Sequence, residues 1–198
     1  NIDAAHKFAW CENVGWTNWR DAGDPAGSNG IVVHDTFLSG FMWSENAGWI
    51  NLGDGTPANG EFYANANDTD FGVNLDPDTG ALSGFAWGEN VGWVNFDTSA
   101  VSPNDAAFDA CQHAFFGFAW GENIGWINLA DATHFVALEP CGFGDFDCEG
   151  DVDLLDWEAF SAFMSGPDVI VDCSVFDSEG DRDVDLRDAA DCTDVFAP

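Results

Sequence analysis

The residues best suited to chemistry are acidic side chains that recur at fixed spacing in the last quarter of the chain. The twelve-residue segment 145–156 has oxygen donors at positions 1, 3, 5, 7, 9 and 12, with Gly150 at position 6, where such a loop must turn sharply. Segment 177–188 repeats this spacing 32 residues later. One such loop can give six or seven oxygens to a hard cation, and that ligand number favours Ca²⁺ over Mg²⁺.

The spacing therefore predicts two calcium sites, and it assigns a role to each oxygen donor. We expect the first loop to bind through the side chains of Asp145, Asp147, Glu149, Asp153 and Asp156 and the carbonyl of Asp151. We expect the second loop to bind through the side chains of Asp177, Glu179, Asp181, Asp185 and Asp188 and the carbonyl of Asp183. Each loop leads into a stretch with helical spacing of apolar residues.

Residues 145–196 resemble a type I dockerin, a duplicated calcium loop and helix module of exported bacterial proteins. The resemblance rests on the two Asp-Val-Asp-Leu-x-Asp endings and on the duplication at about 30 residues. It implies two bound calcium ions and docking to a cohesin partner. Two features depart from the family pattern. Arg182 replaces Gly at position 6 of the second loop, and Leu154-Leu155 and Leu186-Arg187 stand at positions 10 and 11, where cohesin-binding dockerins often have Ser or Thr.

A nine-residue motif recurs four times in the rest of the chain. The copies are Phe8–Trp16, Phe41–Trp49, Phe85–Trp93 and Phe118–Trp126, each reading Phe-x-Trp-x-Glu-Asn-x-Gly-Trp. Each copy predicts a β-hairpin, because alternating residues precede a turn in which Gly permits positive φ and Asn tolerates left-handed backbone. The two tryptophans of a copy should face each other across the hairpin. The motif also resembles Trp-x-Glu-Asn-x-Gly-Trp repeats of bacterial surface proteins.

A further strand is expected before each hairpin, so that the repeating unit is a three-stranded meander. The chain should stack about four such units into a mainly β domain, solenoid-like or sandwich-like, over residues 1–140. A small α-helical EF-hand-like or dockerin-like domain should follow over residues 141–198. The first unit lacks a full leading strand, and Thr133–Leu138 resembles a leading strand with no hairpin after it. Both ends of the stack should therefore present open edges.

The charge balance excludes several classes of partner. The 36 acidic residues against 4 Lys and Arg give a net charge of −32, which repels nucleic-acid phosphates and anionic lipid headgroups. No apolar run reaches the ~20 residues of a membrane helix. The start at Asn1 is interpreted as that of an exported protein whose signal peptide has been removed.

Six cysteines, an even number without a C-x-x-C pair, indicate an oxidising extracellular or cell-surface setting. We expect at least four of them to be paired, with Cys141, Cys148, Cys173 and Cys192 pairing among themselves. Cys11 and Cys111 would then bond within the chain or between subunits. Asn67, in the sequence Asn-Asp-Thr, is a candidate for glycosylation.

The recurrent glutamates and tryptophans could be taken for a catalytic site or a sugar-binding site. Glu12, Glu45, Glu89 and Glu122 recur beside aromatic rings, but one Glu in the same turn of every copy is typical of structure and not of a catalytic pair, which needs two different environments. The ten tryptophans could form a face that stacks on sugars, yet filling the core of small repeats is the commoner role of such rings. No motif of an enzyme is present.

The sequence thus predicts a non-catalytic extracellular structural protein. In the favoured hypothesis it is a calcium-stabilised filament or surface-assembly subunit whose copies join head to tail, with Thr133–Leu138 completing the first unit of the next copy. Two alternatives remain open: a dockerin-type anchoring module with a β-repeat spacer, and a glycan-binding surface protein.

Overall fold

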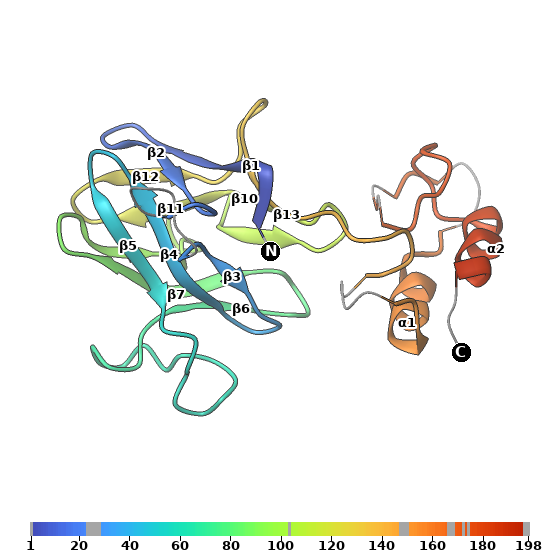
Figure 1. Ribbon diagram of the computed structural model, residues 1–198, viewed down its shortest axis with the longest axis horizontal. Coiled ribbons are helices and arrows are strands. Elements are labelled where there is room, and N and C mark those ends of the chain that lie inside the picture. The colour runs from blue at the N-terminus through green and yellow to red at the C-terminus, as the bar shows by residue number, and fades with distance from the viewer. Residues whose placement is uncertain are drawn as a thin grey trace. The chain divides into compact units, whose positions relative to one another are not determined.

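The structure is a computed structural model that describes residues 2–22, 29–102, 104–146, 151–165, 169–171, 173 and 175–195. The chain divides into two compact units. Unit 1 comprises Asn1–Asp109 and Ala114–Glu139, and unit 2 comprises Ala110–His113 and Pro140–Pro198. Unit 2 therefore includes a short piece of chain, Ala110–His113, from the middle of the repeat region. Among the described residues the structure is mainly β (Figure 1).

The four motifs form four hairpins, and the remaining described strands of unit 1 are short. The hairpin strands are β1 (Ile2–Cys11) with β2 (Gly15–Asn18), β4 (Leu38–Ser44) with β5 (Gly48–Gly53), β7 (Leu82–Gly88) with β8 (Gly92–Asn95), and β11 (Phe118–Gly121) with β12 (Gly125–Asn128). The others are β3 (Val32–Val33), β6 (Val73–Leu75), β9 (Ala107–Asp109), β10 (Ala114–Phe116) and β13 (Val136–Leu138).

The expected hairpin geometry is confirmed in all four copies. The two tryptophans of each motif pair directly across the hairpin, as Trp10 does with Trp16, at 4.7–5.1 Å between the paired rings. The glycine of each turn has a φ between 74° and 82°, a region that side chains rarely adopt. The motif asparagines are not among the described residues with positive φ, so the expected left-handed role is wrong for them.

The hairpins close into an antiparallel eight-stranded barrel, in the order β12-β11-β8-β7-β5-β4-β2-β1. Closure comes from the pairing of β12 with β1, in which Trp10 lies opposite Asn128 and Cys11 opposite Ile127. The expected solenoid or sandwich of stacked meanders is therefore wrong. A row of twisted hairpins can curl until its last strand meets its first, which removes the edges that an open sheet would expose.

Side-chain alternation decides which residues fill the barrel. The buried residue at the equivalent position of the first strand is alanine in three hairpins, as with Ala9 and Ala119, and Met42 in the second hairpin. Its partners on the second strands include Ile50 and Ile127. The motif tryptophans point outward, and six of the eight are 37–40% exposed. The expectation that tryptophans fill the core is wrong for the motif tryptophans, because the interior of an eight-stranded barrel is only just wide enough for the side chains that already fill it. It is right for Trp19, outside the motifs, which is fully buried in the core.

The side chains of the motif asparagines join each hairpin turn to the next. Asn46 Nδ2 donates to the Val14 carbonyl oxygen at 3.1 Å, and Asn90 Nδ2 donates to that of Ala47 at 3.1 Å. The series continues from Asn123 to Val91 at 3.1 Å and from Asn13 to Ile124 at 2.9 Å. These four hydrogen bonds form a closed ring around one end of the barrel, which gives the recurrent Asn a structural role.

The expected leading strands are present before the second and third hairpins. β3 pairs with β4, and β6 pairs with β7 after a turn that Asp76 caps by accepting from the Asp78 and Thr79 amides at 3.0 Å. The expected open ends are wrong. β1 pairs with β12, and β13 pairs with β1 as well as with β10, so both ends of the repeat region are paired within one chain.

Unit 2 contains α1 (Leu154–Phe163) and α2 (Leu186–Val195), each directly after an acidic segment. Its core gathers Phe160 and Phe176 with the position-8 valines Val152 and Val184, all at most 6% exposed. In the part of the chain that the structure describes, no helix is long and apolar enough to cross a membrane; α1 and α2 have ten residues each.

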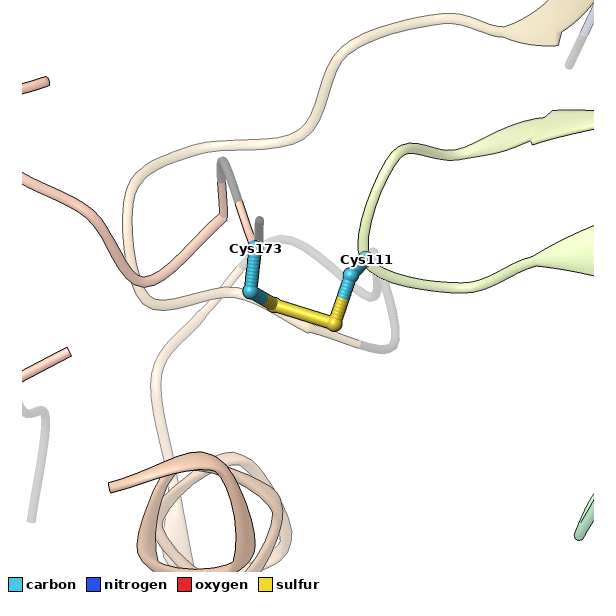
Figure 2. The surroundings of a disulfide bond; sticks show 2 residues. All are labelled: Cys111 and Cys173. Atoms are coloured by element: carbon cyan, nitrogen blue, oxygen red, sulfur yellow. A yellow bond between two sulfur atoms is a disulfide. The ribbon is translucent and has the colours of Figure 1, made fainter. Parts of the chain in front are cut away.

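A disulfide within unit 2 joins Cys111 to Cys173 (Figure 2). Cys111 lies in the turn Ala110–His113 between β9 and β10, 62 residues before its partner. Cys141 is disulfide-bonded as well, and Cys148 lies outside the described residues. The expected pairing confined to the C-terminal cysteines is wrong, as is a Cys11–Cys111 bond, because a turn from the repeat region supplies one sulfur to unit 2.

Candidate metal centre

Three carboxylates of the second acidic loop converge in unit 2. One side-chain oxygen from each of Asp183, Asp185 and Asp188 lies within 4.8 Å of the others. Asp183 and Asp188 are buried, at 8% and 0% exposure, while Asp185 is half-buried. Grouped oxygens of this kind are what a hard divalent cation binds. Asp183 joins the group through its carboxylate, whereas the sequence had predicted a carbonyl ligand.

Backbone amides hold the last carboxylate of this loop in place. Asp188 Oδ2 accepts from the Asp185 amide and Oδ1 accepts from the Ser178 amide, both at 2.8 Å. Asp185 in turn accepts from the Arg187 amide at 2.6 Å, at the start of α2. These bonds fix the side chains of positions 9 and 12 relative to each other without involving side-chain cations.

The start of the loop is also built around a carboxylate. Asp177 accepts from the amides of Gly180 at 2.7 Å and of Arg182 at 2.8 Å, which bends the segment back on its first residue. Arg182 adopts a φ of 70°, so an arginine occupies the left-handed position that favours Gly. Glu179 forms an ion pair with Arg187. Asp177, Glu179 and Asp181 are outside the converging group of three.

The first loop repeats the second where the structure describes it. Asp156 accepts from the Phe146 amide at 2.6 Å and from the Asp153 amide at 2.7 Å, and Asp153 accepts from the Leu155 amide at 2.7 Å. Each of these bonds has its counterpart 32 residues later in the second loop. Asp145 and Asp156 are buried, at 7% and 1% exposure. Asp147 and Glu149 lie outside the described residues, and Asp151 is exposed.

The donors present fit a hard divalent cation. They are carboxylates throughout, four of them nearly buried, and unit 2 contains only two basic residues, Arg182 and Arg187, against 17 acidic ones. Carboxylate oxygens gathered in this way are the ligands that hard divalent cations prefer.

Two cysteines of the described part are free thiols, and both are buried. Burial raises the pKa of Cys192 above its usual value, and the charge of Asp156 adds to this. Cys11 faces the barrel interior and its thiol donates to the Ile124 carbonyl oxygen at 3.2 Å. Both groups are therefore protected from solvent oxidants in the folded chain.

A second candidate site is a surface pocket of about 430 Å³ on unit 1. Its aromatic lining consists of Phe71, Phe85 and Trp93, and acidic side chains of Asp68 and Glu122 border it. Glu122 lies in the turn of the fourth hairpin, where its Oε1 is 3.5 Å from the Trp93 amide nitrogen on the third. The four motif glutamates are exposed in their turns, and this contact gives Glu122 a role specific to one copy.

The candidate glycosylation site borders the same pocket. Asn67 is exposed, and its Oδ1 accepts from the Thr69 amide at 2.9 Å and from the Thr69 hydroxyl at 2.8 Å. Its modification stays a prediction.

Comparisons of the chain with protein-family models, with curated proteins and with solved structures return no match. The resemblance to dockerins therefore rests on the residues of the two loops alone. Sequence reasoning missed three functional features: the ring of asparagine bonds, the aromatic pocket and the Cys111–Cys173 bond. The unequal spacing of the motifs, 33, 44 and 33 residues between leading tryptophans, was the one available signal for the pocket.

Proposed function

We propose that the chain is a non-catalytic extracellular protein that binds calcium in unit 2 and attaches through that unit to a partner protein. The barrel of unit 1 is then the domain that the attachment displays. Oxygen-rich loops in duplicate, disulfides that persist in oxidising compartments, and a strongly acidic surface all support this proposal.

One observation carries the attachment role. Leu154 and Leu155 at the start of α1 are 72% and 63% exposed, and Leu186 at the start of α2 is 77% exposed. They follow position 9 of each loop, so the duplication places exposed leucines at equivalent sites. Large exposed apolar side chains at related positions are typical of protein interaction sites. A metal ion bound beside each helix start would hold these leucines in fixed orientation.

The filament hypothesis loses its strand-exchange mechanism, because β13 and both ends of the repeat region are already paired within the chain. Association of copies through unit 2 remains one outcome of the same experiment. The partner implied by the dockerin resemblance is a cohesin. Positions 10 and 11 of the two loops lack the Ser or Thr common in cohesin-binding dockerins, and in this proposal apolar contacts of the leucines replace the contacts of those residues.

The experiment measures binding of the full chain to a purified cohesin panel, and its self-association, by sedimentation velocity with calcium and with chelator. The test variant carries Leu154→Ser, Leu155→Ser and Leu186→Ser, which are exposed and leave the core intact. The matched control is Val101→Ser, 72% exposed on unit 1. Calcium-dependent complexes or polymers that the triple variant loses and the control keeps would support the proposal. A chain that stays monomeric and unbound in calcium would contradict it.

A further inference from the structure

The aromatic pocket of unit 1 is a feature that the fourfold repeat by itself does not produce. The second and third motifs are 11 residues further apart than the other neighbours, and most of the added chain lies in the segment 54–72. This segment brings Phe71 to within 5.2 Å of Trp93, between ring centroids, on the outer face of the third hairpin. The inserted segment has thus placed an additional aromatic ring beside the outward-facing tryptophan of the third hairpin.

The three rings form a corner and not a flat platform. Phe71 meets Trp93 at an interplanar angle of 87°, and Phe85 meets it at 71° with 6.0 Å between centroids. All three rings are half-buried, so each retains accessible surface. Aromatic walls at steep angles surround a rounded group, whereas a sugar ring stacks best on a broad exposed face.

The pocket is also negatively charged. Asp68 and Glu122 are acidic and exposed, and none of the described residues that line the pocket is Lys, Arg or His. The basic residues of unit 1 are Lys7 and Arg20, which form ion pairs with Asp21 and Glu139. A negatively charged corner of aromatic rings attracts a cation through both the ring quadrupoles and the carboxylates.

The amide oxygens of the two pocket asparagines already accept hydrogen bonds from the protein backbone. Asn65 Oδ1 accepts from the Gly72 amide at 3.1 Å, and its Nδ2 donates to the Tyr63 carbonyl oxygen at 3.2 Å. Asn67 Oδ1 accepts from the Thr69 and Asp70 amides. A sugar needs several donors and acceptors to orient its hydroxyl groups. Both amide oxygens are already engaged by backbone amides, and the carboxylates of Asp68 and Glu122 are the charged groups of the pocket.

We propose that this pocket binds an organic cation through a bulky ammonium group, such as a quaternary or N-methylated ammonium. Phe71, Phe85 and Trp93 contact the alkyl groups of the cation, and Glu122 and Asp68 balance its charge. The pocket volume of about 430 Å³ suits a small ligand or the end of a larger one. This site lies on unit 1 and does not depend on the attachment role proposed for unit 2.

The experiment titrates the full chain, in calcium, with choline and with 3,3-dimethylbutan-1-ol, which has the same shape but a carbon atom in place of the charged nitrogen. Isothermal titration calorimetry measures both affinities, and cellobiose serves as the sugar probe. The test variants are Glu122→Gln and Phe71→Leu. Their matched controls are Glu89→Gln, at the same turn position one hairpin earlier, and Phe62→Leu, an exposed ring in the same inserted segment.

We expect saturable binding of choline and at least about tenfold weaker binding of the neutral alcohol. Glu122→Gln and Phe71→Leu should each weaken choline binding about fivefold or more, and the two controls should leave it unchanged. Absence of saturable choline binding, equal affinity for the neutral alcohol, or equal losses in the controls would overturn the proposal. Binding of cellobiose without choline binding would assign the pocket to a sugar and overturn it as well.

Discussion

Asn13 and Ile124 are 111 residues apart in the sequence, and the side-chain amide of Asn13 donates a 2.9 Å hydrogen bond to the Ile124 carbonyl oxygen. This bond joins the turn of the first hairpin to that of the last. It completes the ring that runs through the turns of all four hairpins, at the place where β1 and β12 close the barrel. The motif asparagine, which turn chemistry assigns to its own hairpin, therefore connects neighbouring hairpins.

Replacement of Asn13 tests the importance of the ring at its closing point. We expect Asn13→Ala to lower the free energy of unfolding of unit 1 by about 1 kcal/mol, because the half-buried hydrogen bond to Ile124 is lost. Urea unfolding followed by tryptophan fluorescence measures the change. Glu12→Gln, an exposed substitution in the same turn, is the control and should change little. Equal stability of the two variants would show that the bond is dispensable.

The bond between Cys111 and Cys173 should stabilise unit 2 substantially. It closes a segment of 62 residues, for which loop entropy gives about 4 kcal/mol. We expect the double variant Cys111→Ser/Cys173→Ser to lower the melting temperature of the helices, measured by circular dichroism.

Non-reducing peptide mapping provides the independent check on that disulfide. It should recover the peptides of Cys111 and Cys173 joined, while Cys11 and Cys192 react with an alkylating agent only after denaturation. Rapid alkylation of Cys11 or Cys192 in the native chain would contradict their assignment as buried thiols.

Removal of calcium should destabilise unit 2. A ligand that binds only the folded state adds about 2.7 kcal/mol at a hundredfold excess over its dissociation constant. We expect chelation to lower the melting temperature, and Asp185→Asn to weaken calcium binding measured by calorimetry, since Asp185 belongs to the converging group. Asn still caps a helix, so the fold should survive. Asp194→Asn, exposed in α2, the helix that follows Asp185, is the control. Unchanged calcium affinity in Asp185→Asn would rule out this site.

Arg182 offers a test by gain of stability. Its φ of 70° is unfavourable for a residue with a Cβ atom, so Arg182→Gly should raise the free energy of unfolding of unit 2 by about 1 kcal/mol. The substitution also removes a positive charge from the loop and should strengthen calcium binding. Arg182→Lys keeps both the charge and the Cβ atom and should show neither gain. Chemical denaturation with and without calcium separates the two effects.

His34 predicts a dependence of stability on pH. Burial lowers its pKa below the usual 6.5, against a smaller opposing effect of Asp35, and the ring stacks on Phe37 at 4.3 Å. The neutral ring thus favours the folded state, so its contribution is complete above the unfolded-state pKa and is lost as the pH falls below about 6.5. The difference in unfolding free energy between wild type and His34→Gln should shrink from about pH 7.5 to about pH 5.5. A constant difference over that range would contradict this assignment.

Part of the candidate metal centre could be predicted from the sequence. The spacing predicted the side chains of Asp185 and Asp188 as part of one site, and these two carboxylates do converge with that of Asp183, whereas Asp177, Glu179 and Asp181 are outside the group. It did not predict that Asp183 would contribute its carboxylate, nor that Glu179 would pair with Arg187, because side-chain orientation depends on neighbours brought in by folding. The pocket required Phe71 from one segment and Glu122 from a distant turn, and no local pattern connects them.

The sequence by itself determined the four hairpins and the two acidic loops. Positive φ at Gly15 and its counterparts, cross-strand tryptophan pairs and amide-capped carboxylates all arise between residues close in the chain, where residue type and spacing suffice. Only the tertiary structure decided that the hairpins close into a barrel, that Trp10 and its equivalents face outward, and that Cys111 bonds to Cys173. These outcomes depend on contacts between distant segments and on the space inside a closed sheet, and an alternating pattern does not specify which of its two faces becomes the interior.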